Sequence, residues 1–302
     1  MPMQSNPSPA RYRIVHRTDY QYPQSVAVCQ NEVRMSPRTI GHVICHQNKI
    51  ATDPHPTWAG SHIDYFGNPV VSFSIEAMHD ALVVTSESHV TVQRPDYLNH
   101  LEDDSIDAAW DQVAAGSADW VVDQVDEFVY PSPRIVLTPA MRDYAAVSLV
   151  AGRGIVAAAL DLTRRIHEDF KYDPTATTVT TPVSESFKMR RGVCQDFAHI
   201  QIAMLRSMGI AASYVSGYLR TTPPPGRPRL VGADESHAWV SVYGGRSIGW
   251  FDCDPTNACL AGTDHIPIAI GRDYADVTPM RGVVIGGGSP EMKVSVDVAE
   301  ED

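Results

Sequence analysis

The sequence predicts an α+β protein, in which an N-terminal antiparallel β-sandwich is followed by a core that packs a helix on an antiparallel sheet. Two observations predict this class. Residues 12–94 consist of short β-rich segments separated by proline- and glycine-containing loops, which is typical of a sandwich. Residues 138–219 instead show helical periodicity before a single strand, and a hairpin of two more strands follows. The prolines at 131 and 133 mark the boundary, so we expect domains at 1–135 and 136–302.

Composition excludes several classes of protein. The 302 residues carry a net charge of −12, whereas proteins that bind nucleic acid or anionic membranes need a basic surface. No apolar run approaches the roughly 18 residues of a membrane span, and residues 1–11 lack the apolar segment of a secretory signal. We therefore expect a cytoplasmic protein whose 5 cysteines are thiols.

The N-terminal domain is predicted from residue types. β-branched and aromatic residues are enriched in four segments, 12–16, 42–45, 69–75 and 81–85. The segment 102–127 is acidic, contains no lysine or arginine, and interleaves tryptophan and valine with its charges. We interpret it as an amphipathic helical connector between the domains.

The second domain begins with two helices. Thr138 followed by Pro139 is a strong helix start, since threonine caps and proline suits the first turn, and the helix should reach about residue 149. A second helix is predicted at 155–170 and an extended, threonine-rich loop at 172–182. A third helix at 194–208 ends before Gly209, and a strand at 212–219 follows.

Cys194 is the first residue of that third helix. A thiol at this position lies near the positive end of the helix dipole and near unpaired backbone N–H groups, and both favour the thiolate. The thiolate is the form that attacks a carbonyl carbon. Cysteines in apolar helices are commonly inert core residues, so the assignment depends on partners elsewhere in the chain.

Two strands downstream supply candidate partners. Residues 236–243 and 248–254 are predicted to pair as a hairpin around a turn at 244–247. With a loop of two or four residues, His237 lies directly opposite Asp254, and Trp239 opposite Asp252. A three-residue loop would shift the register by one and place Cys253 or Pro255 opposite His237. In the favoured register His237 takes the thiol proton of Cys194, and Asp254 fixes the orientation of the ring.

Three blocks of the sequence, 192–199, 236–240 and 249–257, resemble the signature blocks of bacterial transglutaminase-like cysteine proteins, within the transglutaminase and papain-like superfamily. Segments 12–18 and 64–68 are similar to the β-rich domain that accompanies this subfamily, and 273–279 fits as well, so the resemblance covers nearly the whole chain. It implies a papain/transglutaminase-like core, with Cys194 as nucleophile, His237 as general base and Asp254 as orienting acid.

The site that stabilises the oxyanion is less defined by the sequence. The backbone N–H of Cys194 is one donor expected from its position at the helix N-terminus. In eukaryotic transglutaminases an upstream tryptophan supplies another, but this sequence has no tryptophan between Trp120 and Cys194. Tyr172 is our candidate replacement.

No cofactor is expected. A metal site formed by Cys253, Cys259 and His265 lacks the paired ligand spacing of known sites, and no acidic loop has calcium-ligand spacing. His199 follows Cys194 by five residues and so points to another side of the helix, which excludes it as the base.

The expected activity is thiol-dependent acyl transfer on an amide or peptide bond of a protein or peptide substrate. Hydrolysis is favoured, which would make the protein a cysteine protease or amidase. Transfer to an amine, which crosslinks proteins, uses the same triad and stays open. The alternative to an enzyme is a binding module that has this fold and no catalytic activity.

Overall fold

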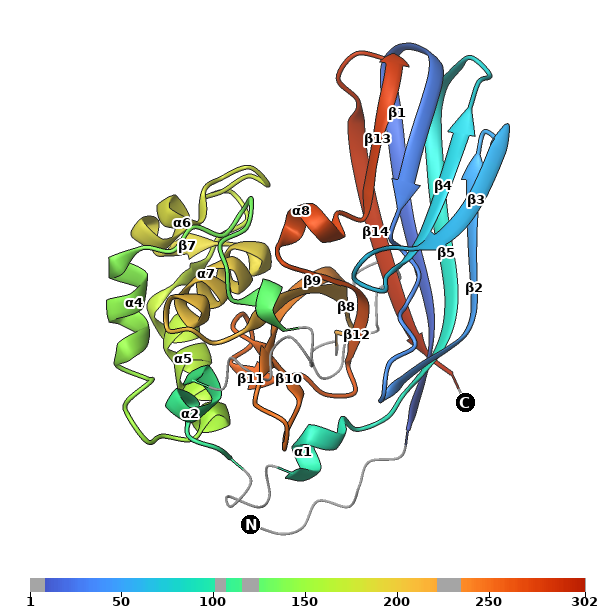
Figure 1. Cartoon of the computed structure of the whole chain (residues 1–302). Helices are drawn as coiled ribbons and strands as arrows, with labels where there is room; N and C mark the ends of the chain where they lie inside the picture. The colour runs from blue at the N-terminus through green and yellow to red at the C-terminus, as the bar shows by residue number, and fades with distance from the viewer. Residues whose placement is uncertain (1–8, 101–106, 116–124, 222–234, 302) are drawn as a thin grey trace, which may run out of the picture.

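The computed structural model describes residues 9–100, 107–115, 125–221 and 235–301 (Figure 1). A long β-sheet built from both ends of the chain stands beside a core of helices and shorter strands. Most of the acidic segment 102–127 lies outside the described residues. Its described neighbourhood contains α1 (Asp96–His100), α2 (Trp110–Ala115) and a short 3-10 helix, η1 (Asp126–Phe128).

Strand β1 (Ala10–Val33) organises the seven-stranded sheet. Its first half pairs with β5 (His79–Val92) on one side and with β14 (Glu291–Glu300) on the other. Its second half pairs with β4 (Pro69–Ile75) and β13 (Met280–Gly286). The remaining strands, β2 (Val43–Asp53) and β3 (Trp58–Ile63), pair with β5 and β4. Every pairing in this sheet is antiparallel, in agreement with the predicted class.

The two C-terminal strands do not belong to the core in which the boundary at 135/136 places them. Strands β13 and β14 run along β1, and Tyr12 lies opposite Glu300. Alternating apolar residues explain this placement, because Val296 and Val298 are buried on the same face as Tyr12 and Ile14. The core is therefore inserted between β5 and β13 of the N-terminal domain.

A five-stranded sheet forms the base of the core, with strand order β11-β10-β9-β8-β12. The bounds are β8 (Ala212–Leu219), β9 (Glu235–Tyr243), β10 (Trp250–Asp254), β11 (Cys259–Leu260) and β12 (His265–Gly271). All pairings in it are antiparallel. A separate parallel pair joins β6 (Lys171–Tyr172) to β7 (Arg191–Gly192).

Helices cover this sheet. They are α4 (Pro139–Ala146), α5 (Ile155–Asp169), α6 (Val183–Met189), α7 (Cys194–Ser207) and α8 (Tyr274–Val277). The Thr138 hydroxyl accepts a hydrogen bond from the N–H of Met141 at 3.3 Å, which is the cap that the sequence predicts for α4. Helix α7 lies in the centre of the core, where most of its side chains are buried. Helix α6 has no counterpart among the predicted elements.

The β domain and the core share an apolar interface along β12. Ile266 and Ile268 pack with Tyr12 and Val298 in one buried cluster. Nearby, Nδ1 of His16 and the hydroxyl of Tyr218 form a buried hydrogen bond of 2.7 Å. The β domain therefore fixes the strand whose first residue is His265. Among the described residues, no helix is both long and apolar enough to cross a membrane.

Candidate active site

Cys194 is the first residue of α7, as the sequence predicts, and its side chain is partly buried. The helix is capped by Asp196, whose Oδ2 accepts the backbone N–H of Val193 at 2.9 Å. The hydroxyls of Thr177 and Ser186 donate to the same carboxylate at 2.6 and 2.9 Å. Asp196 is thereby satisfied within the first turn and is left as a structural group.

Gly192 allows the backbone that precedes α7 to lie directly against the side chain of Asp196. A Cβ at Gly192 would lie 2.4 Å from Oδ2 of Asp196 and 2.7 Å from its Cβ. Any larger residue would displace the cap and with it the first turn of α7. Because Cys194 belongs to that turn, its position depends on a glycine two residues earlier.

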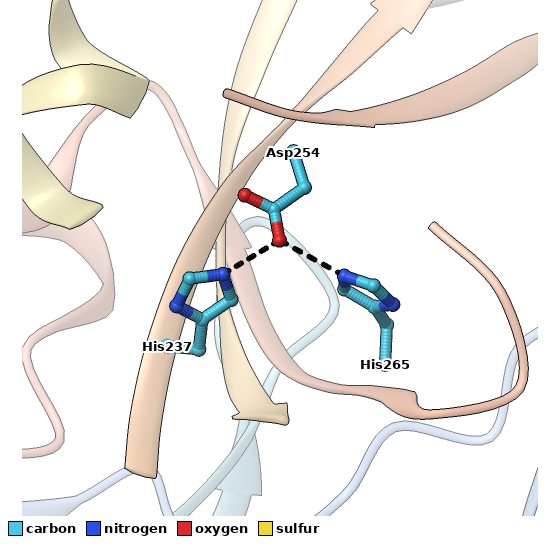
Figure 2. Close-up of side chains that lie close together, drawn as sticks. All are labelled: His237, Asp254 and His265. Carbon is cyan, nitrogen blue, oxygen red and sulfur yellow. Dashed lines mark hydrogen bonds and ion pairs between the residues drawn. The ribbon is translucent and has the colours of Figure 1, made fainter. Parts of the chain in front are cut away.

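The predicted hairpin register is wrong by two residues. Cys253 pairs with Val240 and Asp252 with Ser241, so His237 does not lie directly opposite Asp254. The reason is the loop, which comprises the six residues 244–249 instead of two or four. An even shift keeps every side chain on the same face of the sheet. His237 and Asp254 therefore remain diagonal neighbours, and they form a hydrogen bond of 2.7 Å between Nε2 and Oδ2 (Figure 2).

The carboxylate of Asp254 is fully buried and accepts hydrogen bonds on both oxygens. Oδ1 accepts the backbone N–H groups of Thr256 at 2.8 Å and Asn257 at 3.1 Å. Oδ2 lies 2.7 Å from Nδ2 of Asn257, 2.7 Å from Nε2 of His237 and 3.1 Å from Nε2 of His265. Burial alone would raise the pKa of Asp254, but the hydrogen bonds from His237 and His265, together with the positive charge of His237, hold it far below its usual range.

His237 is 5% exposed and faces two acidic partners. Burial lowers the pKa of His237, but hydrogen bonds with Asp254 and Cys194, together with their negative charge, raise it from 6.5 to about 10. Since Nε2 contacts Asp254, the other ring nitrogen, Nδ1, is left for the thiol. Figure 2 shows this nitrogen on the side of the ring away from Asp254. His237 thus has both of the partners that the sequence predicts for it, Asp254 on one ring nitrogen and Cys194 as its other partner.

Trp239 packs against the rings of both His237 and His265. Its indole lies 6.2 Å from the ring of His237 and 5.2 Å, edge to face, from the ring of His265. Its Nε1 donates to Oδ2 of Asp252 at 3.0 Å, which is again a diagonal contact. Gly217 makes room for the indole, because a Cβ there would lie 2.3 Å from it and 2.4 Å from the backbone oxygen of the neighbouring strand.

Tyr172 lies opposite Gly192 in the parallel β6–β7 pair, and Gly192 precedes Cys194 by two residues. The residue is 45% exposed, and its ring packs edge to face with that of Phe197 at 6.5 Å between centroids. His199, in contrast, is buried on another side of α7, where its Nε2 accepts the N–H of Tyr274 at 3.2 Å. Burial lowers the pKa of His199 to about 4, which is the behaviour of a neutral core histidine.

Two residues of the site were not predicted as part of it. Asn257 lies in the third sequence block, and its position three residues after Asp254 is the only sequence signal that could have identified it as part of the site. The sequence suggests His265 only as a metal ligand together with Cys253 and Cys259. The structure instead turns its ring toward Asp254, on the opposite side from His237 (Figure 2).

Within the described residues, His237, Asp254 and His265 form a group whose ligand atoms lie within 4.8 Å of one another. A metal bound by Nε2 of His265 would require the proton on Nδ1. Nδ1, however, already accepts the backbone N–H of Gly262 at 3.2 Å, whereas the second nitrogen of a ligating histidine normally donates to an acceptor. The arrangement therefore fits a hydrogen-bond network and does not fit a metal centre.

Comparison with known proteins places these features in a family. Residues 12–91 match the model of the bacterial transglutaminase-like N-terminal region, and residues 149–255 match that of the transglutaminase-like superfamily. An uncharacterized protein of Mycobacterium tuberculosis is 38% identical over 292 residues, which cover 95% of this chain and 92% of that protein. One of Mycobacterium leprae is 34% identical over 297 residues, which cover 95% of this chain and 98% of that protein.

A solved structure of a proposed cysteine protease from Cytophaga hutchinsonii has the same fold. It superimposes with a TM-score of 0.75 at 18% identity and covers 99% of this chain and 93% of that one. The α+β class and the resemblance read from the sequence blocks are confirmed by these matches.

Proposed function

The chain belongs to the transglutaminase-like superfamily, and from this membership and the geometry of the site we propose that it is a thiol-dependent acyl-transfer enzyme. In this proposal it acts on amide or peptide bonds through Cys194, His237 and Asp254, and its ordinary outcome is hydrolysis. The supporting observation is the buried 2.7 Å contact between His237 and Asp254, beside a cysteine at a helix N-terminus.

The charge distribution favours an ion pair between thiolate and imidazolium. With a pKa near 10, His237 carries a proton at neutral pH. Its positive charge and the N-terminus of α7 both favour the thiolate of Cys194. Asp254, held ionised by five hydrogen-bond donors, stabilises the imidazolium from the other side.

In the first step Sγ of Cys194 attacks the carbonyl carbon of the substrate, and a C–S bond forms while the carbonyl oxygen becomes an oxyanion. The C–N bond then breaks, and the leaving amine takes the proton from Nδ1 of His237. In the second step neutral His237 removes a proton from water, which attacks the thioester. The carboxylic acid leaves, and the thiolate and imidazolium are restored.

The backbone N–H of Cys194 is the first donor to the oxyanion in this proposal, because it lies at the start of α7. Tyr172 is proposed as the second donor. Its support is its place opposite Gly192, two residues before the nucleophile, on a segment tied to the helix entry.

The test compares the protein with C194A and with C259S on a peptide library that contains backbone amides and glutamine side chains, with products identified by mass spectrometry. Cys259 is a second partly buried thiol close to the site and serves as a matched control. We expect C194A to lose turnover and C259S to retain it. Equal turnover in the parent and C194A would refute the proposal and favour the silent binding module.

Running the same reaction in ¹⁸O-labelled water, with and without a primary amine, separates the two acyl acceptors. Incorporation of ¹⁸O into the acid product is expected for hydrolysis. Products that carry the amine in place of water would instead identify a transglutaminase.

A further inference from the structure

We propose that His265 is a positioning residue of this site, whose Nε2–H holds the Asp254 carboxylate in the orientation that directs His237 toward Cys194. This inference rests on the proposed function, since it assigns a role within the same site. His265 itself does not touch the reacting atoms and acts through Asp254.

The tautomer of His265 is determined by its surroundings. The backbone N–H of Gly262 can only donate, and it points to Nδ1 of His265 at 3.2 Å. Nδ1 must therefore be unprotonated, which puts the ring proton on Nε2. Nε2 lies 3.1 Å from Oδ2 of Asp254, so it donates to the carboxylate.

The ring is also held in place. The N–H of His265 donates to the carbonyl of Gly262 at 3.1 Å, so the two residues bond each other in both directions across a short turn. Trp239 packs against one side of the ring, and the following residue, Ile266, is fixed in the apolar interface with the β domain. His265 is thus a donor of fixed direction on a fixed strand.

This donor has a specific effect on Asp254. The Oδ1 atom is held by two backbone N–H groups, so the contacts at Oδ2 decide how the carboxylate is directed toward His237. His237 and His265 approach Oδ2 from opposite sides (Figure 2). Loss of the N–H of His265 removes one of the contacts that direct Oδ2, so Asp254 would hold the His237 imidazolium less firmly toward Cys194, and the thiolate that the imidazolium stabilises would be lost at a higher pH.

The remaining surroundings limit the choice of variants. A cavity of about 510 Å³ is lined by His265, Asn257 and Cys259, among other residues, so a smaller side chain at 265 would admit water to Asp254. Glutamine can place its amide N–H where Nε2 of the histidine lies, and methionine fills similar space without a donor. H265Q and H265M therefore form a matched pair.

Several titratable or charged groups surround His237, Asp254 and His265 and must be kept constant in this comparison. They are His237 on β9, Cys194 on α7, Cys253 on β10, Cys259 on β11, and Asp264 with Arg220 at the rim of the cavity.

The test measures the rate at which iodoacetamide alkylates Cys194 as a function of pH, quantified on the Cys194 peptide by mass spectrometry. No substrate is needed. In the parent, fast alkylation should persist into acidic pH, because the His237 imidazolium, directed by Asp254, stabilises the thiolate that reacts. For H265M we expect the acid limb to move up by about one pH unit, with a loss of about tenfold in rate on that limb, the size expected for one hydrogen bond to a charged group. H265Q should stay within about threefold of the parent.

Each other outcome is decisive. If the pH profile of alkylation is the same in H265M as in the parent, or if it shifts equally in H265Q and H265M, the donor has no role and the inference is wrong. If Cys194 of the parent reacts no faster than a model thiol at any pH, the proposed function fails instead. Tight 1:1 binding of Zn²⁺ to the parent, abolished in H265M, would overturn the hydrogen-bond assignment in favour of a metal site.

A measurement on the parent protein keeps the inference testable even if H265M does not fold. Nitrogen chemical shifts of ¹⁵N-histidine report which ring nitrogen carries the proton. The geometry predicts an unprotonated Nδ1 and a protonated Nε2 for His265 at neutral pH. A protonated Nδ1 would refute the inference.

Discussion

Replacing Asp254 with asparagine tests the site most directly, because the change preserves size and alters only charge and donor pattern. The backbone N–H groups of Thr256 and Asn257 point at Oδ1 and cannot become acceptors. In D254N the amide oxygen must therefore take this position, and the NH₂ group takes the position of Oδ2. There it faces Nε2 of both His237 and His265, as well as Nδ2 of Asn257.

The two histidines respond differently. His237 must present an unprotonated Nε2 to the NH₂ group, which moves its proton to Nδ1 and leaves no base facing the thiol. His265 cannot make the same change because the N–H of Gly262 occupies its Nδ1. Two donors then face each other in a buried position, at a cost of about 1–3 kcal/mol in the free energy of unfolding. A wrong tautomer of this kind lowers kcat about 10⁴-fold in a serine-protease triad, equivalent to about 5.5 kcal/mol in the barrier.

The assay compares kcat for the parent, D254N and D252N on a peptide turned over by the parent, after thermal unfolding confirms that each variant is folded. Asp252 lies on the same strand, and its carboxylate accepts the Nε1–H of Trp239, which an asparagine oxygen can also accept. D252N should therefore retain activity within a few-fold. A folded D254N whose kcat stays within tenfold of the parent would refute the tautomer reasoning.

Three further predictions concern packing, pH and the oxyanion. G217A should lower the free energy of unfolding by about 1–3 kcal/mol, because the new methyl group collides with Trp239, and it should also slow the alkylation of Cys194. G262A is the control in the calorimetric measurement, because a Cβ at Gly262 meets nothing within 4 Å. Equal stability of the two variants would contradict the packing argument. Burial lowers the pKa of His237, but its hydrogen bonds raise it from 6.5 to about 10, so between these values the folded state binds more protons than the unfolded state and stability should decrease as pH rises. Denaturant titrations should show a slope of up to about 1.4 kcal/mol per pH unit in this window, flattened in H237Q; a parent as flat as H237Q would exclude a raised pKa. Y172F should lower kcat about 10²–10³-fold with little change in KM if the hydroxyl binds the oxyanion, and unchanged kcat would remove Tyr172 from the site.

His237 and Asp254, which the sequence predicts as neighbours, are hydrogen-bonded in the structure although the predicted register is incorrect. The hairpin loop is longer than predicted, yet the shift is even, so His237 and Asp254 stay on one face and meet diagonally. A one-residue error would have separated them. The side-chain pattern records the face of a strand reliably, whereas loop length depends on turn geometry that composition does not specify.

The long-range features could not be predicted in the same way. The pairing of β13 and β14 with β1 joins residues that are 247 to 288 positions apart, and alternation along a strand does not identify its partner. His265 illustrates the same limit, since its role depends on a turn with Gly262 and on β12 being adjacent to β8. Local patterns predict elements and faces, while strand order must be read from the structure.

The inserted topology decides the order in which the molecule comes apart under tension. β14 pairs antiparallel with β1, and Glu300 lies opposite Tyr12. A force on the C-terminal end of β14 therefore breaks its backbone hydrogen bonds to β1 one pair after another. β14 and β13 are peeled away first, and the next strand to be drawn out is β12, which carries His265. An unfoldase that pulls the chain from its C-terminal side would thus separate His265 from Asp254 while α7 is still folded.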